Sequence, residues 1–279
     1  MKKLKLLLVL FIGIALSTAY SCNKDDEDDN GGGDGGGGTT PKTCYIKKET
    51  YADGSYSQIE YNSNHKAIKV TEYDSTGKVD ERTELSYDSN GKIIKMENFD
   101  GTTLSGKFEY SYDAQGKLSK ADIFGDQGGT FKKIGYYEYT FTGDNLTKLV
   151  TKVEYLGQTI EAEKVEFTYS GGNAVTQKDY AFDYGSLSLK LEFTTTYEYD
   201  TKINPYRGLG ANYIMGDPQF ISKANVTKMT VKDNQGIVQK DQSSNITYEY
   251  NDSNYPTKAT DVSFDNSETD VTIFDYDCI

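Results

Sequence analysis

The sequence lacks most of the residues on which catalytic and metal sites depend. Its 279 residues include one histidine, three cysteines and no tryptophan. A single histidine leaves Ser-His-Asp and Cys-His catalysis without their parts, and a zinc site needs several spaced cysteines and histidines. That histidine, His65, ends the short polar segment 62–65, so we interpret it as a turn residue. We therefore predict no catalytic residue, no metal, no cofactor and no enzymatic activity.

The chain is also poor in positive charge. Acidic residues outnumber basic ones by 43 to 30, which gives a formal net charge of −13 and a pI of about 4.6. Proteins that bind nucleic acid through its phosphates carry basic patches, so this balance argues against nucleic acid as a partner. The many carboxylates leave one catalytic alternative open, a pair of the kind that glycosidases use.

The N-terminus has the pattern of an export signal. Basic residues precede an apolar run over residues 6–16, which is too short to span a bilayer as a stable helix. Ala19 and Ser21 then lead to Cys22. These residues resemble the lipobox of bacterial lipoproteins, which implies that residues 1–21 are a signal peptide and that Cys22 carries lipid. Secretion without lipid is the alternative.

The segment 22–42 is expected to be an acidic export signal and a tether. Residues 23–29 are too charged to fold, and glycine dominates residues 31–38. The acidic run resembles the export signal that follows the lipidated cysteine in Bacteroidetes surface lipoproteins. The resemblance implies an outer-membrane protein that is anchored by its N-terminal lipid and faces the cell exterior. A generic acidic spacer is the alternative.

Residues 43–279 are predicted to form a single all-β domain. A tyrosine-rich pattern recurs in this part of the chain, most clearly at 85–96, 108–121, 137–149 and 248–259. Each copy has alternating aromatics, a polar turn with Gly or Asn, and then an apolar-x-Lys-apolar step that breaks the alternation. This order predicts β-hairpins with a bulge just past the turn. Roughly fourteen to sixteen such strands would form an antiparallel up-and-down meander.

The alternation also predicts which way the side chains point. In one copy, Phe108 and Tyr110 share a sheet face, and Glu109 and Ser111 share the other. A membrane barrel presents an apolar band to lipid. Because the face opposite the aromatics is polar, we expect the aromatics to point inward. We also expect the domain to stay soluble without its anchor.

The repeats resemble two known groups of proteins. They are similar to the tyrosine–aspartate (YD) repeats of Rhs-type proteins, and more closely to a Bacteroidetes lipoprotein family of unknown function with a porin-like fold. The resemblance runs from about Cys44 to Cys278 and is strong at 197–206. It implies a large meander that closes into a barrel or a barrel-like roll, and it implies no activity.

Two cysteines remain if Cys22 carries lipid. Cys44 and Cys278 lie at opposite ends of the β domain, in a compartment that permits disulfides. We predict a Cys44–Cys278 disulfide, which would make the first and last strands neighbours. Two unpaired thiols at the ends of an open sheet are the alternative.

The segment 203–222 departs from the repeat. A non-repetitive loop of this length is either functional or covers a barrel end. We propose a possible contact surface made by Tyr206, Arg207, Tyr213 and Met215, while the alternative is that these side chains cap the core. The sequence as a whole predicts a surface protein that acts as a binding or structural module for a glycan or a protein. The alternative function is a glycan-active hydrolase with a carboxylate pair in the barrel mouth.

Overall fold

The computed structural model describes residues 42–155, 157–209, 214 and 216–279. The predicted signal peptide 1–21, Cys22 and most of the tether 22–42 lie outside the described residues. The same holds for Tyr213 and Met215.

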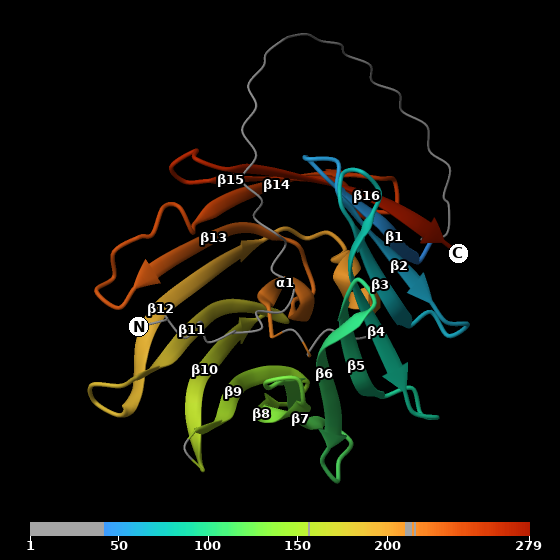
Figure 1. Cartoon of the computed structure of the whole chain (residues 1–279). Helices are drawn as coiled ribbons and strands as arrows, with labels where there is room; N and C mark the ends of the chain where they lie inside the picture. The colour runs from blue at the N-terminus through green and yellow to red at the C-terminus, as the bar shows by residue number, and fades with distance from the viewer. Residues whose placement is uncertain (1–41, 156, 210–213, 215) are drawn as a thin grey trace.

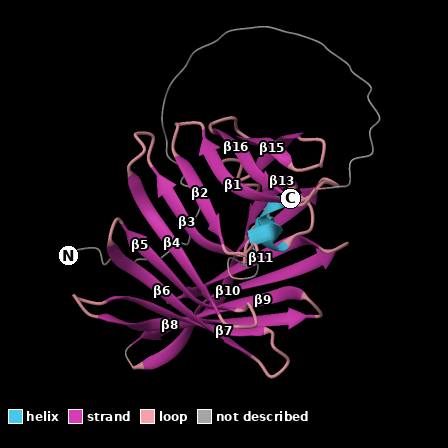
Figure 2. Ribbon diagram, turned by 90° about the vertical axis from the view of Figure 1, so that its right-hand side faces the viewer, coloured by secondary structure: helices cyan, strands magenta, loops and turns pink. Residues whose placement is uncertain are grey.

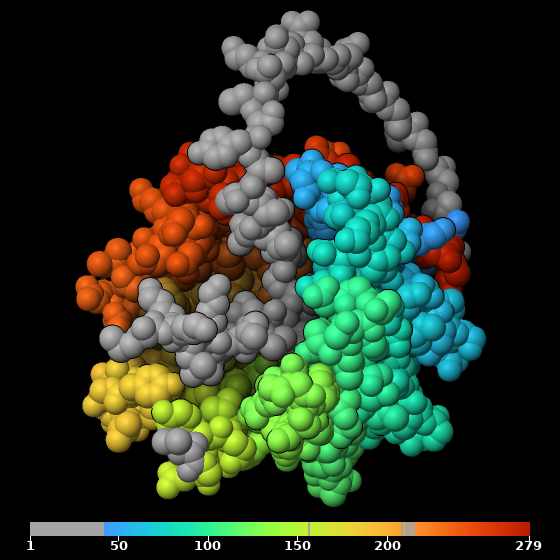
Figure 3. All heavy atoms as spheres, in the orientation of Figure 1, coloured from blue at the N-terminus to red at the C-terminus, as the bar shows by residue number. Residues whose placement is uncertain are grey.

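Sixteen antiparallel strands follow one another around a closed barrel. The colours in Figures 1 and 3 run around the ring in chain order, so that the first strands meet the last. The predicted all-β meander with barrel closure is confirmed. The strands are β1 (Cys44–Tyr51), β2 (Tyr56–Tyr61), β3 (Ala67–Tyr73), β4 (Val79–Tyr87), β5 (Ile93–Asp100), β6 (Thr103–Tyr112), β7 (Leu118–Asp126), β8 (Phe131–Thr142), β9 (Asn145–Tyr155), β10 (Gln158–Ser170), β11 (Asn173–Asp183), β12 (Ser188–Tyr199), β13 (Val226–Asp233), β14 (Ser244–Tyr250), β15 (Pro256–Ser263) and β16 (Thr269–Cys278).

The barrel closes where β1 pairs with β16. Cys44 is directly opposite Cys278, with their Cα atoms 4.1 Å apart, and the two cysteines form a disulfide. The predicted disulfide is therefore confirmed, and it joins residues 234 positions apart. Because each of the sixteen described strands has two partners, the sheet that they form has no open edge.

Aspartate side chains build many of the hairpin turns. The carboxylate of Asp88 accepts hydrogen bonds from the backbone N–H groups of Asn90 (2.9 Å) and Lys92 (2.8 Å). Gly91 has a φ of 73°, which glycine adopts without steric cost. His65 has a φ of 55° at the corresponding position of its turn, which confirms it as a turn residue. The aspartates with the same role elsewhere are Asp74, Asp113 and Asp233.

The repeated tyrosine stabilises the bulge at seven places in the barrel. The pairing of β4 with β5 skips Ile94, so the predicted bulge is present just past the turn. A bulge disrupts the ladder locally, and the Tyr112 hydroxyl of the next hairpin donates a hydrogen bond to the adjacent Ile93 carbonyl (2.7 Å). The tyrosine pattern thus has a structural role. The same bond joins Tyr61 to Ile46, Tyr87 to Ala67, Tyr169 to Leu146, Tyr199 to Ala174, Tyr248 to Val226 and Tyr276 to Pro256.

The inner face of the barrel holds the core. Phe108, Tyr110 and Tyr139 are buried in the larger of two hydrophobic clusters, as the alternation predicts. The expectation that all the aromatics point inward is wrong for one group, however. Phe99, Phe124, Tyr136 and Tyr180 lie on the outer face, where a Lys or Arg cation sits 3.8–4.4 Å from each ring centroid. The cation–π contact and the lysine stem cover these rings, so they need no place in the core.

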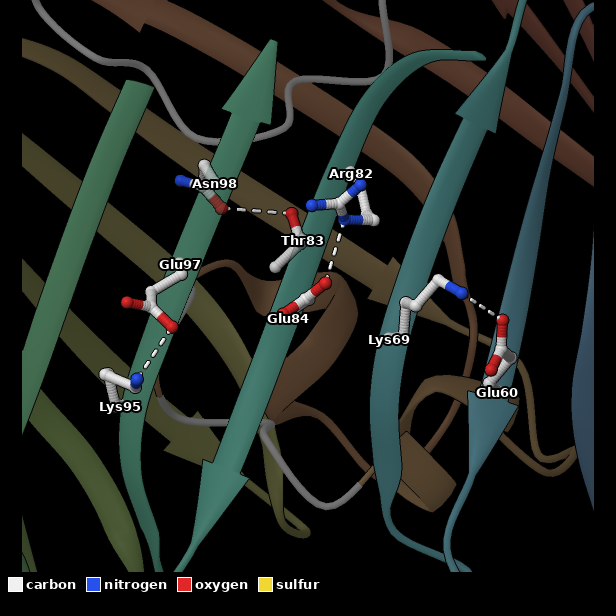
Figure 4. Close-up of polar contacts among 8 residues, drawn as sticks. All are labelled: Glu60, Lys69, Arg82, Thr83, Glu84, Lys95, Glu97 and Asn98. Atoms are coloured by element: carbon white, nitrogen blue, oxygen red, sulfur yellow. Dashed lines mark hydrogen bonds and ion pairs between the residues drawn. The ribbon is translucent and has the colours of Figure 1, made fainter. Parts of the chain in front are cut away.

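Ion pairs cover the outer face of the barrel. Lys69 pairs with Glu60 across β3 and β2, while Lys95 pairs with Glu97 within β5 (Figure 4). Thr83, between the outward pair Arg82 and Glu84, and Asn98, next to Glu97, face inward and bond to each other (3.0 Å). The outer wall is therefore charged and the inner wall is aromatic and polar. Within the described residues, neither helix is long and apolar enough to cross a membrane.

Candidate functional site

A plug fills one end of the barrel. It consists of the segments 203–209 and 216–222, which contain the short helices η1 (Pro205–Leu209) and α1 (Pro218–Ile221). Figures 1 and 2 show these helices within the ring of strands. The backbone N–H of Ile203 bonds the carbonyl of Asn254, in the turn between β14 and β15. The plug therefore lies at the barrel end that carries this turn and the paired cysteines, which we call the plugged end.

Buried polar side chains fix the plug in place. The amide of Asn204, 4% exposed, donates hydrogen bonds to the carbonyls of Gln219 (2.6 Å) and Ser222 (2.9 Å), which ties the two segments together. The Ser222 hydroxyl donates to the Tyr199 hydroxyl (2.9 Å) and accepts from the backbone N–H of Ala174 (3.0 Å). These bonds join the plug to β12 and β11, so it is an ordered part of the inner wall.

Tyr206 joins the plug to β1 on the opposite side of the barrel. Its hydroxyl donates a 2.6 Å hydrogen bond to Oε1 of Glu49, which is buried on the inner face. Its ring contacts those of Phe220 and Phe274, at centroid distances of 4.9 and 6.3 Å. Burial raises the pKa of Glu49 to about 7, although the Tyr206 hydrogen bond opposes the rise and the charge of Glu72 adds to it. Glu49 therefore titrates near neutral pH.

A cavity of about 500 Å³ lies above the plug, inside the barrel. Asn204, Pro205 and Tyr206 of the plug form its floor, and the inner faces of β11–β16 form its wall. Asp241 and Glu268 line it at the opposite barrel end, where the β13–β14 loop and the β15–β16 turn lie. We call that end the mouth. The size of the cavity and its mixed apolar and polar lining are typical of a small-molecule site.

Among the described residues, the charged side chains that line the cavity are all acidic. They are Asp179, Asp241, Asp261, Glu268 and Asp270. Burial raises the pKa of Asp179, as do the charges of Glu163 and Glu192, while the Gln177 amide, which donates to its Oδ1 (2.7 Å), lowers it. Burial also raises the pKa of Asp261, which lies directly opposite Asp270 in the pairing of β15 with β16. The cavity is therefore a region of negative potential.

The structure places the predicted contact residues in different environments. Tyr206 faces the cavity, whereas Arg207 is exposed to solvent. Because Tyr213 and Met215 lie outside the described residues, a shared contact surface of the four stays a prediction. The sequence reasoning missed Asp179, Ser244 and Asp261. Their signal is a polar residue at an inward position of the alternation, such as Asp261 between Ala259 and Ser263.

The cavity carboxylates do not form a metal centre. Among the described residues, no group of three or more His, Cys, Asp or Glu side chains converges closely enough to hold a metal ion. Asp179 belongs to β11 and Asp261 to β15, while Asp241 lies in a loop near the mouth. The negative charges are thus distributed over the depth of the cavity.

Comparisons with known proteins support the fold. No protein-family model matches the chain, and no curated protein matches it either. Among solved structures, a porin-like protein from Bacteroides vulgatus is similar, with a TM-score of 0.52, 13% identity, and coverage of 84% of this chain and 99% of that chain. A porin-like protein from Bacteroides uniformis has a TM-score of 0.41 and 12% identity over 85% of this chain and 100% of its own. At 13% identity, the likeness to the Bacteroides vulgatus protein shows the barrel fold alone.

Proposed function

We propose that this protein is a lipid-anchored surface protein that binds a small ligand, or the end of a glycan chain, inside its barrel. The observation that carries the proposal is the cavity of about 500 Å³, which ends on an ordered plug and has aromatic and polar walls. The hydrogen bonds at the bulges give the tyrosine repeat a structural role, and the ion pairs do the same for the charged residues of the outer wall. The cavity has no such structural role.

The anchor would hold the cavity mouth away from the membrane. The predicted lipid site, Cys22, precedes β1, and β1 begins with Cys44 at the plugged end. A tether from that end leaves the mouth at the opposite end of the barrel. In a protein on the outer face of the outer membrane, the mouth would therefore face the surroundings.

The binding proposal is tested on an array of glycans and host proteins with the full chain and two matched variants. Thr272 lines the cavity, whereas the next residue, Ile273, is on the outer face and 48% exposed. A phenylalanine at position 272 would fill cavity space, and one at position 273 would point to solvent. We expect Thr272→Phe to lose the bound ligand and Ile273→Phe to keep it. Equal loss or equal retention by both variants would contradict cavity binding.

The anchor is tested separately. The intact mass of the membrane-extracted protein should correspond to a chain that begins at a lipidated Cys22, and the mass of an unmodified chain would refute this. Replacement of Lys24, Asp25 and Asp26 by alanine should leave the lipid in place but hide the protein from proteases outside the cell. Unchanged protease access would contradict the export signal.

A second candidate is a glycan-active hydrolase. The observation that favours it is the direct pairing of Asp261 with Asp270 beside the cavity, together with the raised pKa of Asp261. Two neighbouring carboxyl groups, one of them with a raised pKa, are the arrangement that glycosidases use. Mass spectrometry of any glycan bound in the array decides between the two functions. A binding protein leaves the glycan intact, whereas a hydrolase shortens it and loses this activity in Asp261→Asn.

A further inference from the structure

The cavity carboxylates have no cationic partners on their own side of the wall. The lining residues include five carboxylates and, among the described residues, no Lys, Arg or His. Two lysines of the same strands point the other way. Lys228 pairs with Glu198 and Lys258 with Glu249, both on the outer face. The barrel wall thus separates its charges, with ion pairs outside and uncompensated negative charge inside.

A buried polar pair also faces the cavity. Ser244 lines the cavity and is only 6% exposed. Its hydroxyl acts on the carboxylate of Asp261, on the neighbouring strand, and lowers the pKa of that carboxyl against the larger rise that burial causes. Neither group has a cationic partner among the lining residues, so a charged N–H donor from a ligand would supply a charge-assisted hydrogen bond at this place.

The apolar part of the wall also suits a cation. Phe193, Tyr197, Tyr248 and Phe274 line the cavity together with the carboxylates. Aromatic faces attract an ammonium group, and they pack equally well against the methylenes or ring carbons that carry it. Acidic groups that are spread over the depth of the cavity fit a ligand with more than one positive charge better than a single compact ion.

We propose that the cavity binds protonated aliphatic amines, with Asp261 and Asp179 as counter-ions and the cavity aromatics around the carbon skeleton. This inference rests on the proposed cavity-binding function and narrows it to one ligand chemistry. Two sources share that chemistry, an aliphatic polyamine and an oligosaccharide of amino sugars.

Isothermal titration of the full chain in non-ionic detergent tests the proposal with three probes. Spermidine represents the polyamines, and a glucosamine tetramer represents the amino sugars. The N-acetylglucosamine tetramer has the same rings without the charge, and so it is the matched neutral control. We expect binding of at least one amine probe, and binding of the neutral tetramer at least tenfold weaker than that of the glucosamine tetramer. The amine that binds identifies the source.

Variants then test the residues. A hydrogen bond between charged groups contributes enough that Asp261→Asn should weaken amine binding about tenfold to a hundredfold. Glu198→Gln, on the outer face of β12, should change it less than about twofold because exposed ion pairs contribute little. Removing a buried negative charge should not lower the melting temperature, so loss of binding in Asp261→Asn will not reflect unfolding.

The possible failures are distinguishable. If the neutral tetramer binds as tightly as the amine and Thr272→Phe abolishes both, cavity binding stands and the preference for amines is wrong. If neither amine binds, or if Asp261→Asn binds amines as tightly as the unaltered chain, the amine proposal is overturned. If Glu198→Gln weakens binding as much as Asp261→Asn, the cations are bound on the outer face, and the cavity is not their site.

Discussion

Replacement of Glu49 by glutamine should change how the stability of the barrel depends on pH. Glu49 is buried, and its pKa lies at about 7 instead of the ordinary 4.5. Between these two values the folded chain holds a proton that the unfolded chain has released. The free energy of unfolding therefore falls as the pH rises from about 4.5 to about 7. Over that pH interval the protonation of Glu49 contributes about 3 kcal/mol to the free energy of unfolding, and this contribution is fully lost above pH 7.

Glu49→Gln removes the ionisation but keeps an oxygen that accepts the Tyr206 hydrogen bond. We expect the variant to be about 2–3 kcal/mol more stable than the unaltered chain at pH 8, and equally stable near pH 4.5. Urea unfolding, followed by circular dichroism at both pH values, measures the difference. Other buried carboxylates affect both chains alike, so the difference isolates Glu49. Glu60→Gln, on the outer face, is the control and should show no such gain. If the free energy of unfolding changes with pH by the same amount in Glu49→Gln and in the unaltered chain, Glu49 does not titrate as its burial implies.

Three further variants, one of them with a matched control, test the construction of the barrel by urea unfolding. Tyr112→Phe should cost about 1 kcal/mol because the bulge carbonyl of the preceding hairpin loses its hydroxyl donor, and an unchanged stability would refute that role. Loss of the disulfide in the double variant Cys44→Ala, Cys278→Ala should cost up to about 5 kcal/mol, and no loss would mean that the β1–β16 pairing closes the barrel unaided. Gly135→Ala should cost about 1–3 kcal/mol, since its Cβ would lie 2.3 Å from the Lys152 carbonyl oxygen. Gly125→Ala, which meets only the flexible end of Ile134, should cost less, and the reverse order would contradict the packing argument.

The fold was predictable because its signals are local. The aspartate turn, the glycine after it and the break in alternation all lie within about ten residues of one another, and each hairpin repeats them. The disulfide followed from the number of cysteines and their compartment. Closure of the ring then required only that the meander return to its first strand. The outward aromatics were mispredicted, because Phe99 and Tyr180 have the same alternation as buried rings. Only the neighbouring strands reveal the cations that cover them.

The cavity was not predictable in the same way. Tyr206 and Glu49 are 157 residues apart, and no pattern in either segment indicates their contact. Asp179 and Asp261 belong to strands that look like all the others, and they share a cavity only because the ring closes. Inward polar residues in a strand are a weak signal, since Thr83 and Asn98 are also inward and polar but satisfy each other. What separates a candidate site from the core is whether the polar atoms find partners, and that depends on three-dimensional geometry.

The outer wall gives a final prediction, on how the protein meets the membrane. Lys107 with Glu109 and Lys152 with Glu138 are outward pairs of the kind that most strands of the barrel carry. In a membrane barrel, a lysine that faces the middle of the bilayer costs roughly 2–4 kcal/mol, so a wall with such residues on strand after strand strongly favours water. We therefore expect residues 42–279, freed of the anchor, to remain monodisperse without detergent in size-exclusion chromatography with light scattering. The proposed lipid at Cys22 would then attach the protein to the membrane without help from the outer wall of the described barrel. Aggregation that only detergent reverses would mean that the outer wall contacts lipid in spite of its charges.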